Sequence, residues 1–277
     1  MRSENFVKTV TGLYVSPDTG EEIPEHITVP CYHCVICQDN RRNEWATRCE
    51  LEARNSGSSY FITLTYADEN LPSDGCVSLA EFQRFVKSLR QAAPCAVRYF
   101  GCAEYGPRFS QRPHYHANLF WQLDLDQETV EALVNTAWQL GFVKVSRCTR
   151  NHYRYVAKYT LKWLNSAPVE GMTEPFAVMS RRPGIGASYF EQNKGFCMSD
   201  IPLDNGYKAS VPRYGVQKLS LQDQAALKRR KLAYMESLKA LPDNELRLRG
   251  EALERSIYRK CVFLYGKQEI KHFGGDG

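Results

Sequence analysis

Runs of β-branched and aromatic residues mark four strands along the chain. Residues 60–66 (YFITLTY) form the strongest run, and this composition predicts a central strand. Residues 97–104 (VRYFGCAE) and 114–121 are also strand-like, and a polar loop separates them, so they predict a hairpin. A shorter run over residues 142–145 (FVKV) predicts one more strand.

Helical periodicity fills the segments between these strands. Residues 78–89 begin with a capping box of Ser78 and Glu81. Residues 126–140 predict a second amphipathic helix, which Gly141 is expected to end. A third helix is expected over residues 151–164, and residues 220–265 are helical and charged. The buried faces would consist of Leu79, Phe82, Phe85, Val86 and Leu89 in the first helix and Val130, Leu133, Val134 and Trp138 in the second.

The order of strand, helix, hairpin, helix and strand predicts an α+β fold, a central antiparallel sheet with helices packed on one face. The 277 residues are 43% hydrophobic and 24% charged, as in globular proteins. We expect a Cys-rich segment with a basic helix (1–55), the sheet core (56–166), and a basic loop with a helical region (167–277). No apolar run reaches the roughly 18 residues of a membrane span, and the first residues lack the apolar stretch of a signal peptide.

Two histidines in the hairpin are candidate metal ligands. Strand alternation points His114 and His116 to one face and Tyr115 to the other. The hairpin would bring Glu104 beside the histidines. Two imidazoles and a carboxylate leave open positions on a divalent ion. Paired strand histidines are also common as structural or surface residues, so the pair alone leaves both interpretations open.

The helix over residues 151–164 carries two tyrosines one turn apart. At about 100° per residue, Tyr155, Lys158, Tyr159 and Lys162 share one arc of this helix. A solvated stripe is one interpretation. The other is phosphodiester chemistry, because a tyrosine can attack phosphorus and a lysine can neutralise the developing charge. The opposite arc, expected to face the core, contains Tyr153, Val156, Thr160, Trp163 and Leu164.

Cysteines cluster near the beginning of the chain. Cys31, Cys34 and Cys37 have C-x-x-C-x-x-C spacing. With Cys49 or His33 as the fourth ligand, they would hold a structural Zn²⁺ ion. A zinc ribbon usually has two separated pairs, so buried or merely reduced thiols are the alternative.

Basic residues occur on the first helix and in a later turn. Arg41, Arg42 and Arg48 would form a helix face that either meets phosphates or is only solvated. Arg181 and Arg182 begin a Gly/Pro-containing loop whose backbone would approach a phosphate closely, unless it is a plain surface turn. The net charge of +5 permits a polyanionic partner without requiring one.

Four of these segments, in this order, resemble the HUH-type replication initiators of rolling-circle replicons. They are the strand 60–66, Glu104 with residues 114–116 (HYH), the helix segment 155–159 (YVAKY), and residues 179–186 (MSRRPGIG). The closest likeness is to the replication proteins of gokushoviruses, single-stranded DNA phages of the Microviridae, over residues 28–190. One departure is Tyr115, where the family usually has a bulky hydrophobic residue.

The resemblance implies a metal-dependent nickase and strand transferase. Glu104, His114 and His116 match the family's ligands for Mg²⁺ or Mn²⁺. Tyr155 or Tyr159 would attack the DNA and leave a 5′-phosphotyrosine link and a free 3′-hydroxyl. The alternating use of two tyrosines would then release a closed single-stranded circle.

Further roles and partners follow from the same resemblance. Lys158 matches the family's motif lysine, and we expect Lys162 to contact phosphate. The substrate would be single-stranded DNA at the viral origin, in the cytoplasm of the bacterial host. No GxxxxGK[ST] loop is present, so a host helicase would unwind the duplex and a host polymerase would extend the 3′ end.

Two other function classes remain as alternatives. Two histidines and a carboxylate also describe a non-haem iron oxygenase. That class leaves the tyrosine–lysine stripe unexplained and uses a double-stranded β-helix. The second alternative is a non-catalytic DNA-binding module that contains zinc and structural histidines.

Overall fold

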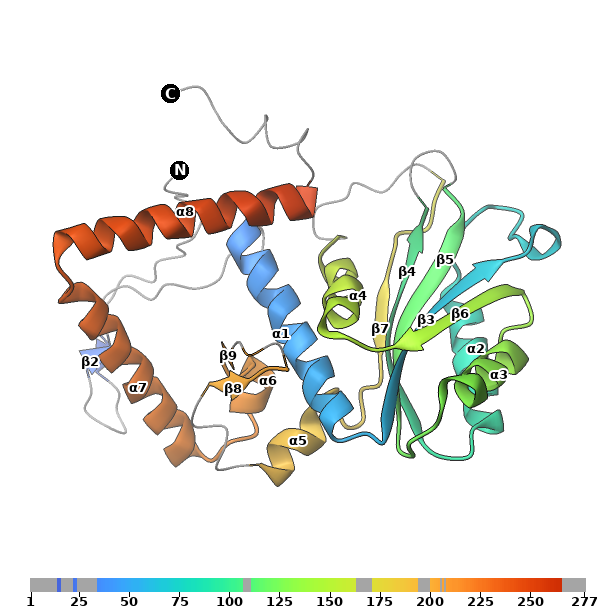
Figure 1. Ribbon diagram of the computed structural model, residues 1–277, viewed down its shortest axis with the longest axis horizontal. Coiled ribbons are helices and arrows are strands. Elements are labelled where there is room, and N and C mark those ends of the chain that lie inside the picture. Colours follow the sequence, from blue (N-terminus) through green and yellow to red (C-terminus); the bar gives the residue numbers. More distant parts are fainter. Residues whose placement is uncertain are drawn as a thin grey trace, which may run out of the picture. The chain divides into compact units, whose positions relative to one another are not determined.

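The computed structural model describes residues 14–15, 22–23, 34–106, 111–162, 171–193, 200–204, 206 and 208–265 (Figure 1). The chain forms two compact units. Residues 42–234 make up the unit that contains the sheet, and residues 1–41 and 235–277 belong to the other. The three-segment division at residues 55 and 166 stays a prediction.

The sheet unit is built on five antiparallel strands. They are β3 (Ser58–Tyr66), β4 (Val97–Tyr105), β5 (Pro113–Trp121), β6 (Gly141–Arg147) and β7 (Ala177–Met179), in the order β6-β3-β5-β4-β7 (Figure 1). The predicted α+β class and antiparallel sheet are confirmed. The sequence did not predict β7, because three residues are too few to show a period.

One face of the sheet packs against α2 (Leu79–Ala92) and α3 (Gln127–Ala137). Burial alternates strictly along β3, so Tyr60, Ile62, Leu64 and Tyr66 all enter this core. Burying each such side chain contributes about 1.5–3 kcal/mol. The Ser78 side chain accepts a hydrogen bond from the backbone N–H of Glu81, as the predicted helix cap requires.

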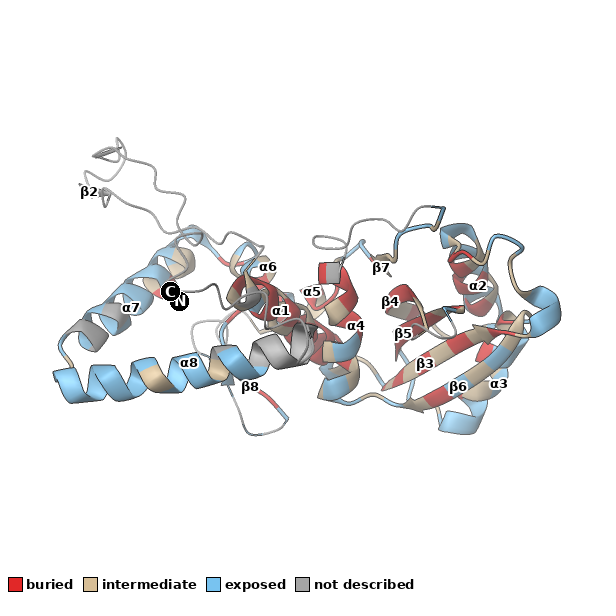
Figure 2. Ribbon diagram, turned by 90° about the horizontal axis from the view of Figure 1, so that it is seen from above, coloured by how far each residue is buried: buried red, intermediate tan, exposed pale blue. Residues whose placement is uncertain are grey.

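The opposite face is also covered, which corrects the expectation of helices on one face. Here α4 (Arg150–Lys162) and α1 (Val35–Arg54) close a second apolar cluster. Trp45 of α1 stacks on Phe100 of β4 with ring centroids 5.1 Å apart. The reason lies in β4 and β5, whose residues are buried on both faces over most of their length and therefore need cover on both sides (Figure 2).

Shorter elements complete the chain. In the sheet unit, η2 (Asp68–Asn70) follows β3. A third apolar cluster, which includes Leu51 and Phe190, is surrounded by four short elements: α5 (Ala187–Gln192), the paired strands β8 (Ile201–Pro202) and β9 (Lys208–Ala209), and α6 (Arg213–Val216). The predicted C-terminal helical region is α7 (Leu221–Lys239) and α8 (Asp243–Tyr265), and near the beginning of the chain β1 (Tyr14–Val15) pairs with β2 (Glu22–Ile23). Among the described helices, none combines the length and apolar character needed to cross a bilayer.

Gly141 has a different role from the one predicted. The helix α3 ends at Ala137, three residues before the predicted end at residue 140, and Gly141 begins β6. A Cβ atom at position 141 would lie 2.2 Å from the carbonyl oxygen of Thr65 on the neighbouring strand. Glycine is required here because two backbones approach closely.

Replacing Gly141 by alanine should therefore destabilise the sheet unit. Because backbone atoms cannot move away as a flexible side chain can, we expect a loss of about 1–3 kcal/mol in the free energy of unfolding, measured by urea denaturation. Gly250→Ala is the control, since nothing lies within 4 Å of a Cβ atom added in α8. Equal stability of the two variants would contradict the close approach.

Candidate metal and tyrosine site

Strand register brings the three predicted ligands together. Glu104 of β4 lies directly opposite His114 of β5, and His116 lies opposite Thr63 of β3. Side chains opposite each other share a face, and here it is the face on which α4 packs. One ligand atom from each of Glu104, His114 and His116 lies within 4.8 Å of the others. Within the described part of the chain, no other group of three or more such residues converges in this way.

Both imidazoles point Nε2 at the same carboxylate oxygen. His114 Nε2 lies 3.1 Å and His116 Nε2 lies 3.0 Å from Glu104 Oε1. The His116 contact lacks hydrogen-bond geometry, so this buried nitrogen has no hydrogen-bond partner among the residues that the structure describes. A buried polar atom without a partner is costly unless another group binds it.

In each imidazole, the contact made by Nδ1 bears on whether Nε2 is free to bind a metal. His114 Nδ1 lies 3.0 Å from the backbone oxygen of Arg112, which can only accept, so Nδ1 carries the proton. A neutral His114 therefore presents a lone pair at Nε2. His116 Nδ1 lies 2.9 Å from Thr63 Oγ1, and this contact holds the ring with Nε2 turned toward Glu104.

The donor set fits a divalent cation. One nitrogen from each histidine and a carboxylate oxygen lie within 4.8 Å of one another, in a setting where Glu104 is only 4% exposed. Burial by itself would raise the pKa of Glu104. Contacts with His114, His116 and the two tyrosines outweigh burial and hold that pKa well below its usual value. The carboxylate is therefore ionised at neutral pH and available as a ligand.

The two tyrosines of α4 meet the same carboxylate. Tyr155 Oη donates to Glu104 Oε1 at 2.6 Å, and Tyr159 Oη donates to Tyr155 Oη at 3.3 Å. Tyr155 is 39% exposed, whereas Tyr159 is only 3% exposed, so the interpretation of both as a solvated stripe is wrong. Burial and the proximity of Glu104 raise the pKa of both phenols, which keeps them protonated at rest.

Other residues of α4 and β5 lie where the helix and strand periods place them. Lys158 is half-buried on α4, while Lys162 is the last residue of that helix and its side chain lies outside the described residues. Tyr153 is buried against Ser59, and Tyr115 lies on the opposite face of β5, as predicted.

Sequence reasoning missed three residues around this site. Thr63 orients His116, while Phe61 stacks between His116 (centroids 5.4 Å apart) and His152 (4.5 Å). Phe61 and Thr63 alternate with the buried residues of β3, so strand period alone assigns them to the site face. Strand periodicity could not predict the register between β3 and β5, which brings Thr63 beside His116.

Comparisons with known proteins show what the chain is similar to. A family of replication-associated proteins of the ORF2 type matches residues 59–163, which include the whole site. The chain is 30% identical over 237 residues to replication-associated protein ORF2 of Spiroplasma virus 4, covering 76% of this chain and 73% of that protein. The chain belongs to the replication-associated proteins of small phages, of the Microviridae type. It is also 25% identical over 224 residues to replication-associated protein VP4 of Bdellovibrio phage phiMH2K, covering 73% and 70% of the two chains. No solved structure gives a significant match.

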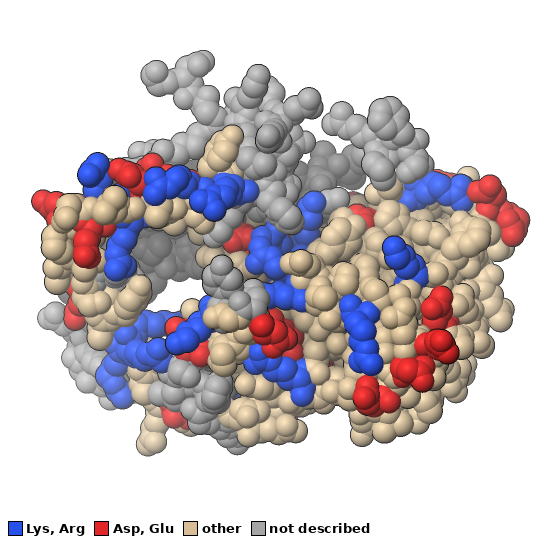
Figure 3. Space-filling view, in the orientation of Figure 1, with Lys and Arg blue, Asp and Glu red and all other residues tan. Residues whose placement is uncertain are grey.

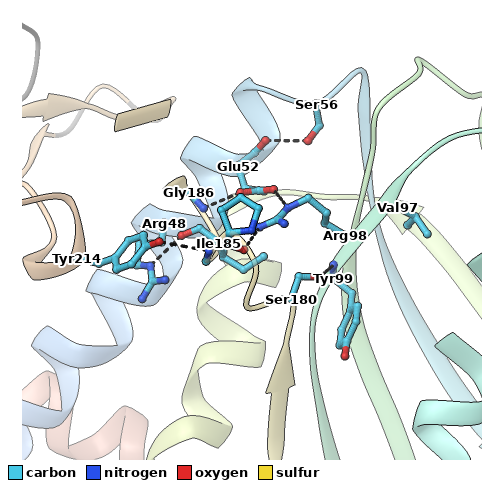
Figure 4. Close-up of polar contacts among 12 residues, drawn as sticks. Arg48, Glu52, Ser56, Val97, Arg98, Tyr99, Ser180, Ile185, Gly186 and Tyr214 are labelled. Atoms are coloured by element: carbon cyan, nitrogen blue, oxygen red, sulfur yellow. Dashed lines mark hydrogen bonds and ion pairs between the residues drawn. The ribbon is translucent and has the colours of Figure 1, made fainter. Parts of the chain in front are cut away.

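In this replication-associated protein, the turn that begins with Arg181 and Arg182 is anchored through its backbone. Figure 4 shows Glu52 of α1 between the Arg98 side chain and the backbone N–H of Gly186, which donates at 2.6 Å. The backbone oxygens of residues 183 and 185 accept from Arg98 (2.8 Å) and Arg48 (3.0 Å), and the N–H of residue 184 donates to the hydroxyl of residue 214 (3.2 Å). These backbone groups are therefore engaged within the protein. The two arginine side chains, by contrast, are exposed.

The predicted basic face of the first helix is not formed. Arg42 is 1% exposed, and the Arg48 guanidinium lies over the rings of Trp45 (4.0 Å) and Tyr214 (4.2 Å). Burial lowers the pKa of Arg48. Arg42 and Arg48 therefore do not present their charges to solvent, and of the three predicted residues Arg41 alone is partly exposed.

The predicted zinc site loses one of its four ligands. Cys37 lies in the first turn of α1 and Cys49 lies twelve residues later on the same helix. A helix rises 1.5 Å per residue, so about 18 Å separates them, far more than one ion can bridge. Cys34 Sγ instead accepts from the backbone N–H of Cys37 at 3.3 Å. Cys31 lies outside the described residues, and whether it binds zinc with Cys34 and Cys37 stays a prediction.

The geometry predicts a measurable effect of Thr63 on metal binding. Thr63→Val removes the partner of His116 Nδ1 while preserving the shape of the side chain. Loss of such an orienting contact typically weakens metal binding about 10-fold to 100-fold, which Mn²⁺ titration calorimetry would detect. The control is Thr136→Val in α3, on the opposite face of the sheet. Unchanged Mn²⁺ affinity in Thr63→Val would show that this contact does not orient a ligand.

Proposed function

We propose that this protein initiates rolling-circle replication by nicking single-stranded DNA at the viral origin with a tyrosine nucleophile. One observation carries the proposal: Tyr155 Oη lies 2.6 Å from the carboxylate on which both histidines converge. A nucleophile, a set of metal-binding groups and an open approach to both are what such a reaction needs. The names of the relatives support the replication role.

Each side chain has a defined role in this proposal. Glu104, His114 and His116 would hold a Mg²⁺ or Mn²⁺ ion, which supplies Lewis-acid polarisation of a phosphate oxygen. Tyr155 is the attacking group, and Lys158 on the same helix neutralises charge that develops on the phosphate.

The reaction exchanges one phosphate ester for another. Tyr155 Oη loses its proton and forms a bond to phosphorus, while the bond from phosphorus to the 3′ oxygen breaks. The 3′ oxygen takes up a proton and leaves as a hydroxyl. The protein retains the 5′ end as a phosphotyrosine ester, so a later attack by a 3′-hydroxyl can rejoin the strand without ATP.

The structure favours Tyr155 as the initiating residue. It is partly exposed and bonded directly to Glu104, whereas Tyr159 is buried and reaches the carboxylate from behind Tyr155. Tyr159 would act second, after Tyr155 has been consumed in its ester.

Partners follow from the chemistry. Single-stranded DNA is the substrate, and a host helicase and host polymerase in the bacterial cytoplasm would open the duplex and extend the 3′ end. On the face shown in Figure 3, Lys and Arg side chains are spread out and interspersed with acidic ones. This distribution suggests moderate DNA affinity from several separate contacts rather than from one basic patch.

Removing one histidine should separate binding from cleavage. His116→Ala removes a proposed ligand nitrogen that has no hydrogen-bond partner in the described part of the chain, so nicking of a single-stranded origin oligonucleotide in Mn²⁺ should fall below detection. Binding of the same oligonucleotide without metal should change by less than about twofold. Full nicking by a folded His116→Ala protein would overturn the assignment.

The tyrosines can be separated by adduct formation on denaturing gels. Tyr155→Phe should form no covalent adduct with the oligonucleotide, because the residue that contacts Glu104 has lost its oxygen. Tyr159→Phe should form the adduct but fail to complete a second round of cutting and joining. Tyr153→Phe, on the same helix but facing the core, is the control and should form adduct normally.

The same assay distinguishes the other function classes. A non-catalytic DNA-binding module would bind the oligonucleotide and give no adduct with any variant. The oxygenase interpretation receives no support from the fold, because the ligands lie on a single five-stranded sheet rather than a double-stranded β-helix.

A further inference from the structure

The site face of the sheet continues beyond the metal-binding residues onto the edge strand β6. In the strand register, Phe142 lies opposite Thr65, which lies opposite His114. Lys144 likewise lies opposite Thr63, which lies opposite His116. These two rows run across β6, β3 and β5, so the side chains at positions 142 and 144 share the face of the histidines.

Burial along β6 independently assigns the two faces. Val145 is buried and Val143 partly buried in the core beneath the sheet, on the side of α2 and α3. Phe142 and Lys144 alternate with them and are exposed, Phe142 at 70%. The helix α4 packs chiefly on β4, β5 and β7, which leaves this part of the site face open.

An exposed phenylalanine beside an exposed lysine is unusual on a sheet that buries its other aromatic rings. Among the described aromatic residues of β3, β4 and β5, none reaches the exposure of Phe142. Lys144 forms no ion pair within the described part of the chain. The surface therefore offers one flat apolar ring and one positive charge.

We propose that Phe142 and Lys144 hold the single-stranded DNA next to the cleaved phosphate, Phe142 by stacking on a base and Lys144 by pairing with a backbone phosphate. The inference rests on the proposed function for the location of that phosphate. Single-stranded nucleic acid is the ligand that combines π-faces with regularly spaced negative charge. The surface is continuous with the histidine site through two shared rows of side chains.

The dimensions agree with a short DNA track. Neighbouring strands lie about 4.8 Å apart, so two spacings place the backbone of β6 about 10 Å from that of β5. Stacked nucleotides advance about 3.4 Å each. The contacts at positions 142 and 144 therefore fall within about three nucleotides of the metal-binding residues.

Base stacking is tested by binding rather than by cleavage. The probe is a fluorescein-labelled oligo(dT) of 20 nucleotides in EDTA, compared with an abasic oligonucleotide of equal length. Phe142→Ala should weaken oligo(dT) binding roughly 5-fold to 100-fold and leave abasic binding nearly unchanged. Phe142→Trp should restore binding. Leu79→Ala, an exposed apolar residue on α2, is the control.

The phosphate contact has its own signature. Lys144→Ala should weaken both probes and lower the slope of log affinity against log salt by about one, as expected for one lost phosphate contact. Lys87→Ala on α2, beneath the opposite face of the sheet, should change neither quantity.

The outcomes separate this inference from the proposed nicking reaction. If Phe142→Ala and Lys144→Ala bind both probes as the wild type does, the inference is wrong, even when Tyr155 forms its adduct. If the stacking and salt effects appear but the wild type forms no adduct, the DNA surface stands and the nicking proposal fails.

Discussion

The candidate site depends on one constraint, the pairing register of three adjacent strands. Glu104 and both histidines converge only because β4 and β5 pair with residue 104 opposite residue 114. Pairing β3 with β5 then places Thr63 beside His116. A shift of one residue between β4 and β5 would turn one member of the set to the opposite face, toward α2 and α3. The register of the strands, rather than the site residues themselves, thus determines the geometry.

The buried face beneath the site enforces this register. Tyr115 lies between the two histidines in sequence and points into the core, where its hydroxyl accepts from the N–H of Ser78 at 2.8 Å and contacts the hydroxyl of Tyr66 at 2.8 Å. The strand that carries the ligands is therefore fixed through the side chain between them. The family's usual hydrophobic residue at this position would pack here but could not form these polar contacts.

Sequence patterns predicted the features that follow from strand and helix periodicity. They missed the features that depend on which elements pack against each other. Strand alternation was enough to group His114 with His116 and to turn Tyr115 away, and helix period was enough to align Tyr155 with Tyr159. The burial of Tyr159 and of Arg42 was not predictable, because it depends on which surfaces α4 and α1 cover. The same holds for Cys49, whose separation from Cys37 follows from the unbroken length of α1.

The packing of α4 limits how a second tyrosine could take part in the proposed reaction. The helix holds Val156 and Ala157 fully buried against the sheet. Sliding α4 by one turn would bring Tyr159 to the position of Tyr155, but it would also put Thr160 where Val156 packs and Leu161 where Ala157 packs. A hydroxyl would then enter an apolar cluster and a large side chain would replace a small one, at a cost of several kcal/mol. The helix is therefore held in one position. In the proposed reaction, an exchange between the tyrosines would come from rotation of their side chains and movement of the DNA end.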